Sequence, residues 1–189
     1  YENIAKEEDE HEKELLSLLE EDGLNYLSSI ILGLSDALVE LTGALAGLTL
    51  AFQELKIVAL AGLVTGIAAS FSMAASEFLA TKEESSERSP IKAAFFTGVA
   101  YLSTVLLLIT PYLLLDDDSN MILGLEPHLQ ALCLTLAIGV LIIAKFNFYV
   151  SVAQDQSFKQ RFTEMTVILF VVTSISFIIG FALREWFGI

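Results

Sequence analysis

Five long apolar segments dominate this sequence, at residues 27–51, 57–80, 91–115, 129–152 and 166–187. Each is close to the ~20 residues that a helix needs to cross the hydrocarbon core of a bilayer. A segment in lipid must satisfy its own backbone hydrogen bonds, which favours helices. The chain of 189 residues is 54% hydrophobic and 18% charged. We therefore expect an all-α membrane protein with five transmembrane helices, embedded in the lipid bilayer.

The charge of the chain bears on its partners. The formal net charge is −14, which argues against nucleic acid as a partner and is compatible with gathering cations. The single cysteine, Cys133, excludes an intrachain disulfide. The first residue is Tyr1 and no cleavable signal pattern precedes the first apolar segment. We expect this chain to be a fragment, or a processed form, of something longer.

Lysine and arginine divide unevenly between the two ends of these segments. If the N-terminus is cytoplasmic, the inner side carries most of them: Lys6, Lys13, Lys82, Arg88, Lys92, Lys145, Lys159 and Arg161. The outer side then carries only Lys56 and Arg184. Because loops rich in lysine and arginine stay in the cytoplasm, we expect the N-terminus to be cytoplasmic and the C-terminus to lie on the opposite side.

Residues 1–22 are highly charged, contain a stripe of leucines and lack proline, which predicts an acidic cytoplasmic helix that ends at Gly23. Glu8 and His11 stand three residues apart and share one face of this helix, as di-iron carboxylate bundles require. A solvated acidic face explains the same spacing equally well. One such motif also cannot complete a di-iron site, which needs carboxylates from other helices.

The first apolar segment carries two carboxylates, Asp36 and Glu40, near its middle. One turn of helix separates them, so both lie on the same face. A carboxylate in hydrocarbon is costly and usually faces a bundle interior or a water-filled path. The pair predicts an ion site; the alternative is a structural hydrogen bond to a neighbouring helix.

The second apolar segment carries Met73 and Glu77 on one face. Ideal antiparallel helices would place Glu77 about 5 Å, Met73 about 10 Å, Asp36 about 13 Å and Glu40 about 20 Å below the cytoplasmic edge. The expected order from the cytoplasm is therefore Glu77, then Asp36 with Met73, then Glu40 with Thr65.

These donors select a class of ion. Carboxylates bind any divalent ion, whereas the Met73 thioether is a soft ligand, so the mixture favours Fe²⁺ or Mn²⁺ over Mg²⁺ or Ca²⁺. Protons compete with metal for the same oxygens, which is a basis for metal–proton exchange. A packing role is the alternative for Met73. Glu164 and Met165 repeat the acid and thioether at the membrane edge, where a metal vestibule and interfacial packing both remain open.

Two glycine pairs lie in the same two segments, Gly43 with Gly47 and Gly62 with Gly66. Glycines four residues apart let helix backbones approach closely. They predict helix pairing within the chain or across a dimer.

Both segments are similar to a known family. Residues 32–39 (LGLSDALV) and 46–48 (AGL) resemble the first transmembrane signature of the vacuolar iron transporter family. Residues 62–68 (GLVTGIA), with Ser72-Met73 and Glu77-Phe78, resemble the second. The resemblance implies a homodimer of five-span subunits that exchanges cytoplasmic Fe²⁺ or Mn²⁺ for protons, with Asp36 and Met73 as translocation ligands.

The chain departs from this family at two points. Eukaryotic members carry a long glutamate-rich metal-binding segment between the second and third spans, where this chain has only residues 81–90, TKEESSERSP. Glu40 stands where many members have an uncharged residue.

The N-terminal helix resembles the last helix of rubrerythrin-like, ferritin-type domains, which precede the membrane part in some prokaryotic members. We therefore expect residues 1–23 to be the last helix of a truncated ferritin-like domain and residues 24–189 to be the transporter domain. Glu8 and His11 would be di-iron ligands, and a ferroxidase activity would be possible, only in a longer chain.

The sequence thus predicts a transporter in a prokaryotic plasma membrane, not an enzyme, that moves Fe²⁺ or Mn²⁺ out of the cytoplasm in exchange for protons. No organic cofactor is expected. Two alternatives remain open: a membrane-anchored ferritin-like protein that oxidises iron, and a passive channel for divalent cations. An anchor has no need of Asp36 and Glu40 at depth, whereas a transporter does.

Overall fold

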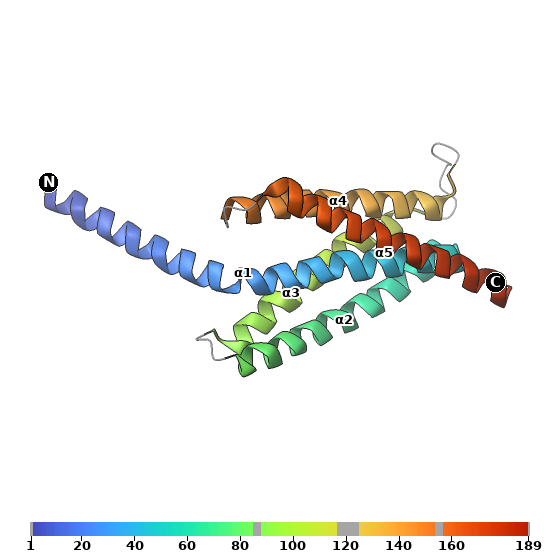
Figure 1. The fold of residues 1–189 in the computed structure, drawn as a ribbon, viewed down its shortest axis with the longest axis horizontal. Helices are drawn as coiled ribbons and strands as arrows, with labels where there is room; N and C mark the ends of the chain where they lie inside the picture. Colours follow the sequence, from blue (N-terminus) through green and yellow to red (C-terminus); the bar gives the residue numbers. More distant parts are fainter. Residues whose placement is uncertain (1, 85–87, 117–124, 154–156, 189) are drawn as a thin grey trace.

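The computed structural model describes residues 2–84, 88–116, 125–153 and 157–188, and within these the side chains from Tyr26 onward, Ala153 excepted. The described residues form five helices: α1 (Glu2–Phe52), α2 (Leu55–Glu83), α3 (Pro90–Leu114), α4 (Pro127–Ala153) and α5 (Phe158–Phe187) (Figure 1). Each contains a stretch long and apolar enough to cross a membrane. The predicted all-α fold with five membrane-spanning helices is confirmed.

α5 begins at Phe158 and so extends beyond the apolar run predicted from residue 166, because residues 158–165 continue the helix although they lack a continuous apolar run. One predicted boundary is wrong, since α1 runs through Gly23 without ending there. A glycine inside a helix costs only about 1 kcal/mol relative to alanine, which the helix-forming residues around it outweigh. The side chains of Glu8 and His11 lie outside the described residues, so their role stays a prediction.

α1 is longer than the membrane-spanning part of the protein. Its 51 residues correspond to about 76 Å of helix, against a hydrocarbon core of about 30 Å. Only the part from Tyr26 to Phe52 is apolar enough to span. The N-terminal part projects beyond the other four helices (Figure 1).

The spanning part of α1 is the centre of the bundle, because it packs against all four of the other helices. In Figure 1 it lies between α2 and α3 on one side and α4 and α5 on the other. The largest fully buried side chains come from all five helices: Tyr101, Tyr112, Leu38, Leu41, Leu45, Leu55, Leu108, Ile109, Ile143, Leu169, Val58 and Val105. This core fixes the face of α1 that carries its two carboxylates.

The glycine pairs contact other helices of the same chain. A Cβ atom on Gly62 would collide with the Leu45 side chain of α1. Gly47 lies directly against α5, where a Cβ atom on Gly180 would overlap the Gly47 carbonyl oxygen. The predicted close helix pairing is therefore confirmed within the chain.

Only Gln53 and Glu54 connect α1 to α2. Gln53 takes up a left-handed backbone conformation, with φ of 54°, and its N–H donates to the Thr49 carbonyl oxygen. This is the usual way to end a helix abruptly, although glycine is the residue that most often does it. The turn reverses the chain at once and makes α1 and α2 an antiparallel hairpin.

Candidate functional site

Two contacts fix how α1 and α2 lie against each other. Near one end Ser29 of α1 meets Glu77 of α2, and near the other Leu45 meets Gly62. The number of residues between Ser29 and Leu45 on α1 differs by only one from the number between Gly62 and Glu77 on α2. The two helices therefore keep the same register along their length. Counting from Ser29, Glu40 lies level with Gly66. This is the register that the sequence predicted when it placed Glu40 beside Thr65.

Glu77 lies at the end of the hairpin where the chain enters the membrane. Its side chain is 8% exposed, and the Ser29 Oγ donates to its Oε1 at 2.6 Å. Ser29 itself is fully buried. A buried carboxylate is tolerated only with hydrogen-bond partners, and Ser29 is a partner that the sequence analysis did not identify.

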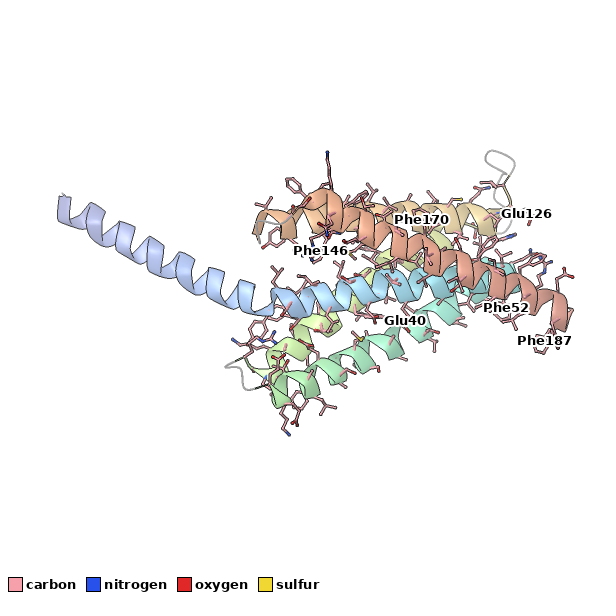
Figure 2. The ribbon with its side chains drawn as sticks, in the orientation of Figure 1. Glu40, Phe52, Glu126, Phe146, Phe170 and Phe187 are labelled. Carbon is pink, nitrogen blue, oxygen red and sulfur yellow. The ribbon has the colours of Figure 1, made fainter. Side chains whose placement is uncertain are left out.

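Asp36 and Glu40 lie together in the middle of the α1 span, where Figure 2 labels Glu40. One turn of helix separates them, so the two carboxyl groups share one face of α1 and lie within electrostatic range of each other. Two carboxylates so close together in a membrane span are costly, which makes the pair a candidate site for a cation or a proton.

Tyr101 of α3 completes this group. Its hydroxyl donates to Glu40 Oε2 at 2.8 Å, and its side chain is only 1% exposed. Glu40 itself is exposed on the surface of the chain, and Asp36 is half-buried. The sequence analysis missed Tyr101, since a tyrosine in an apolar segment gives no sign of which helix its hydroxyl will face.

Met73 is half-buried and packs against the hydrophobic core cluster, as the packing alternative predicts, and its role as a ligand stays a prediction. By the register above it lies about one turn nearer the Glu77 end than Asp36 does. Across the residues whose side chains are described, no three His, Cys, Asp or Glu residues come together as a metal-binding group. The predicted ligands thus line one hairpin at successive levels without forming a closed cage within one chain.

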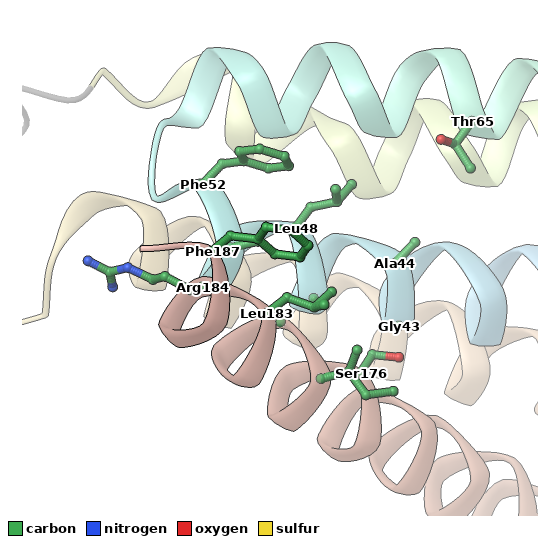
Figure 3. Close-up of a pocket in the computed structure, with 13 residues that line it drawn as sticks. Gly43, Ala44, Leu48, Phe52, Thr65, Ser176, Leu183, Arg184 and Phe187 are labelled. Atoms are coloured by element: carbon green, nitrogen blue, oxygen red, sulfur yellow. The ribbon is translucent and has the colours of Figure 1, made fainter. Parts of the chain in front are cut away.

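A groove continues from Glu40 along the same face of α1. Gly43, Ala44 and Gly47 follow Glu40 on this face and line a space of about 500 Å³ together with residues of α5 and with Thr65 of α2 (Figure 3). The remaining lining is mostly apolar, and Arg184 lies toward the C-terminal end of the groove. The groove therefore begins one turn beyond Glu40 and lies mainly between α1 and α5.

Glu164 and Met165 lie at another place, where α4 ends and α5 begins. Met165 is half-buried, and the Asn147 side-chain amide donates to its sulfur at 3.2 Å. Glu164 is exposed and accepts a hydrogen bond from Gln160 at 2.9 Å. The two residues share a pocket with Asn147.

The segment that holds all four predicted path residues of the hairpin is also the one that is similar to a known family. Residues 27–88 match the VIT family. This VIT match runs from the start of the α1 span to just beyond α2, and it confirms the resemblance to vacuolar iron transporters over that segment. A membrane protein with a VIT segment is consistent with metal-ion transport. No curated protein matches the chain.

Proposed function

We propose that this protein transports Fe²⁺ or Mn²⁺ out of the cytoplasm in exchange for protons. The observation that carries the proposal is the Asp36–Glu40 pair inside a membrane span, in which Glu40 accepts a hydrogen bond from the Tyr101 hydroxyl. Two carboxylates at that depth are costly unless they serve an ion path. The pair lies in the segment that matches the VIT family. The chain acts as a transporter and not as an enzyme, in a prokaryotic plasma membrane.

The residues of the hairpin take successive roles in this proposal. Glu77, released from Ser29, receives the metal from the cytoplasm. Asp36 and Met73 are the next donors, an oxygen and a soft sulfur that together suit a first-row transition metal. Glu40 is the second acid. Any proton bound to Asp36 or Glu40 must leave when metal binds, because a carboxylate binds metal in its deprotonated form. The exchange of metal for protons follows from that competition.

The exposed position of Glu40 supports a homodimer. Thr65, Ser72 and Ser76 of α2 are exposed as well, so a polar strip accompanies Glu40 on the outside of one chain. Polar side chains in a membrane rarely face lipid. We propose that a second copy covers this face, so that the carboxylates of two subunits border a common path.

Metal uptake by liposomes tests the transport proposal. Asp36→Ala should abolish Fe²⁺ or Mn²⁺ uptake driven by a pH gradient, because it removes the first deep carboxylate. Glu54→Ala is the matched control, since Glu54 is an exposed acid in the turn of the same hairpin and should leave uptake near the wild-type rate. Uptake that survives in Asp36→Ala, or that the wild-type protein does not show, would contradict the proposal.

The same liposomes separate exchange from passive flow. An exchanger moves protons in proportion to metal, so a pH-sensitive dye in the lumen should report proton movement only when metal is present. If metal uptake does not depend on the pH gradient and moves no protons, the protein is a channel and not an exchanger.

A further inference from the structure

A polar pocket lies at the junction of α4 and α5, and none of the acids of α1 and α2 lines it. Its volume is about 530 Å³, and its lining is polar for a membrane helix pair: Asn147, Ser157, Gln160, Arg161, Glu164 and Met165. The proposed transport path uses none of these residues.

Asn147 is the unusual member of this pocket. It is fully buried, and its amide nitrogen donates both to the Ile143 carbonyl oxygen, at 2.9 Å, and to the Met165 sulfur, at 3.2 Å. These two acceptors fix the orientation of the amide, because exchanging its nitrogen and oxygen would set acceptor against acceptor. The Asn147 Oδ1 is left buried without a hydrogen-bond partner among the described residues. Such an orphaned acceptor is costly unless something else binds it.

The neighbours of this oxygen are suited to a cation. The Met165 sulfur touches the same amide group and supplies a soft donor. Glu164 supplies a carboxylate, of which one oxygen accepts from Gln160. Asn147, Glu164 and Met165 therefore combine two hard oxygens with one thioether, the mixture that favours a transition metal over Mg²⁺ or Ca²⁺.

Arg161 limits the strength of such a site. Its guanidinium also lines the pocket, and it interacts with other groups of the protein. A positive charge near a bound cation weakens binding. With one carboxylate and one arginine, the pocket suits a cation that is held briefly and then released.

We propose that this pocket is a weak binding site for a divalent transition-metal cation, with Asn147 Oδ1, a Glu164 carboxylate oxygen and Met165 Sδ as donors. The identity of the natural ion rests on the proposed transport function, whereas the existence of the site does not. By the predicted orientation the pocket faces the cytoplasm, so it would collect metal on the side from which transport starts.

Cadmium binding to the full chain in detergent tests the site, with Cd²⁺ as a soft probe and Mg²⁺ as a hard one. Glu164→Gln and Met165→Leu should each weaken one Cd²⁺ site by at least about tenfold, the loss typical even for groups outside a coordination shell. Met165→Leu should change Mg²⁺ affinity far less, because a hard ion gains little from sulfur. Glu185→Gln, an exposed acid at the far end of α5, is the matched control and should change neither.

Arg161→Gln supplies a second test, because its expected result is a gain in affinity, which damage to the fold would not produce. Removing the positive charge should raise Cd²⁺ affinity severalfold. An unchanged number of bound Cd²⁺ ions in the double variant Glu164→Gln/Met165→Leu would overturn the site. Loss of sulfate binding in Arg161→Gln, without any gain for Cd²⁺, would overturn it in favour of an anion.

The two proposals fail separately. If liposomes show no metal uptake while the Cd²⁺ site depends on Glu164 and Met165, the transport proposal falls and this site stands. If Asp36→Ala abolishes uptake while Cd²⁺ binding is unchanged in the Glu164 and Met165 variants, only the proposal of this second site is wrong.

Discussion

Tyr101 is the residue that links the hairpin to the rest of the bundle at the level of the acids. Its ring is buried in the hydrophobic core cluster, and its hydroxyl donates to Glu40. A hydrogen bond to a charged group contributes about 1.5–3 kcal/mol. The phenol therefore holds one carboxylate oxygen in place while the other remains available to Asp36 or to metal.

Tyr101→Phe should slow metal uptake by at least about tenfold, because each ~1.4 kcal/mol of lost interaction with Glu40 is worth a factor of ten. Initial uptake rates in liposomes measure the effect. Tyr112→Phe is the matched control: Tyr112 is equally buried, and its hydroxyl lies 2.7 Å from the Thr49 hydroxyl, a neutral partner. Equal rates in the two variants would show that Tyr101 serves packing alone.

At the residue scale the sequence predicted the acids and missed their partners. Asp36, Glu40 and Glu77 stand out because charge in an apolar segment is costly wherever the helix packs. Ser29 and Tyr101 do not stand out, since serine and tyrosine are common in membrane helices. Their roles depend on which face of α1 and α3 turns inward, which only the packed bundle determines.

Among the helices, the contact between α1 and α5 depends on two glycines. Gly47 and Gly180 let the two backbones touch, and the groove of Figure 3 lies along this same seam. Any side chain at Gly180 has to displace backbone, which cannot move as the end of a flexible side chain can. The seam thus sets both the position of α5 and the width of the groove.

Gly180→Ala should lower the stability of the protein by about 1–3 kcal/mol, the usual cost of overpacking. Thermal unfolding in detergent measures it. Gly139→Ala is the matched control, because an added methyl there would meet the side chains of Leu169, Leu108 and Leu38 at 3.7 Å or more, which is ordinary contact. The interpretation is wrong if both variants unfold at the same temperature.

The helices themselves were largely predictable from the sequence. Apolar runs determine where a chain must be helical in lipid, so all five spans were expected. The start of α5 was not, because residues 158–165 are polar enough to lie outside the hydrocarbon and still helical. The register of α1 against α2 was also predictable, since a turn of two residues leaves the antiparallel pair little freedom to slide.

Across the whole molecule, the kinds of side chain that each face exposes indicate what that face contacts. Large apolar side chains are exposed along much of α5, as expected of a lipid-facing helix, whereas α1 and α2 expose Glu40 and several hydroxyls. The apolar face fits lipid and the polar strip fits a second subunit. The uneven distribution of lysine and arginine then predicts which end of the bundle faces the cytoplasm.

Cysteines at the two ends of α2 test this orientation in a Cys133→Ser background. In intact bacterial spheroplasts a membrane-impermeant maleimide should label Lys56→Cys directly and Lys82→Cys only after permeabilisation, because the outer side carries few positive charges. Both positions are exposed, so both are reachable by the reagent. Labelling in the reverse order would invert the proposed direction of transport.

The two-residue turn at Gln53 and Glu54 also has a consequence for biosynthesis. With so short a link, α1 and α2 must enter the bilayer as a single hairpin while α3 is still being synthesised. Ser29 and Glu77 both belong to this hairpin and can pair at once. Glu40 gains the Tyr101 hydroxyl as a hydrogen-bond donor only after α3 has followed the hairpin into the membrane.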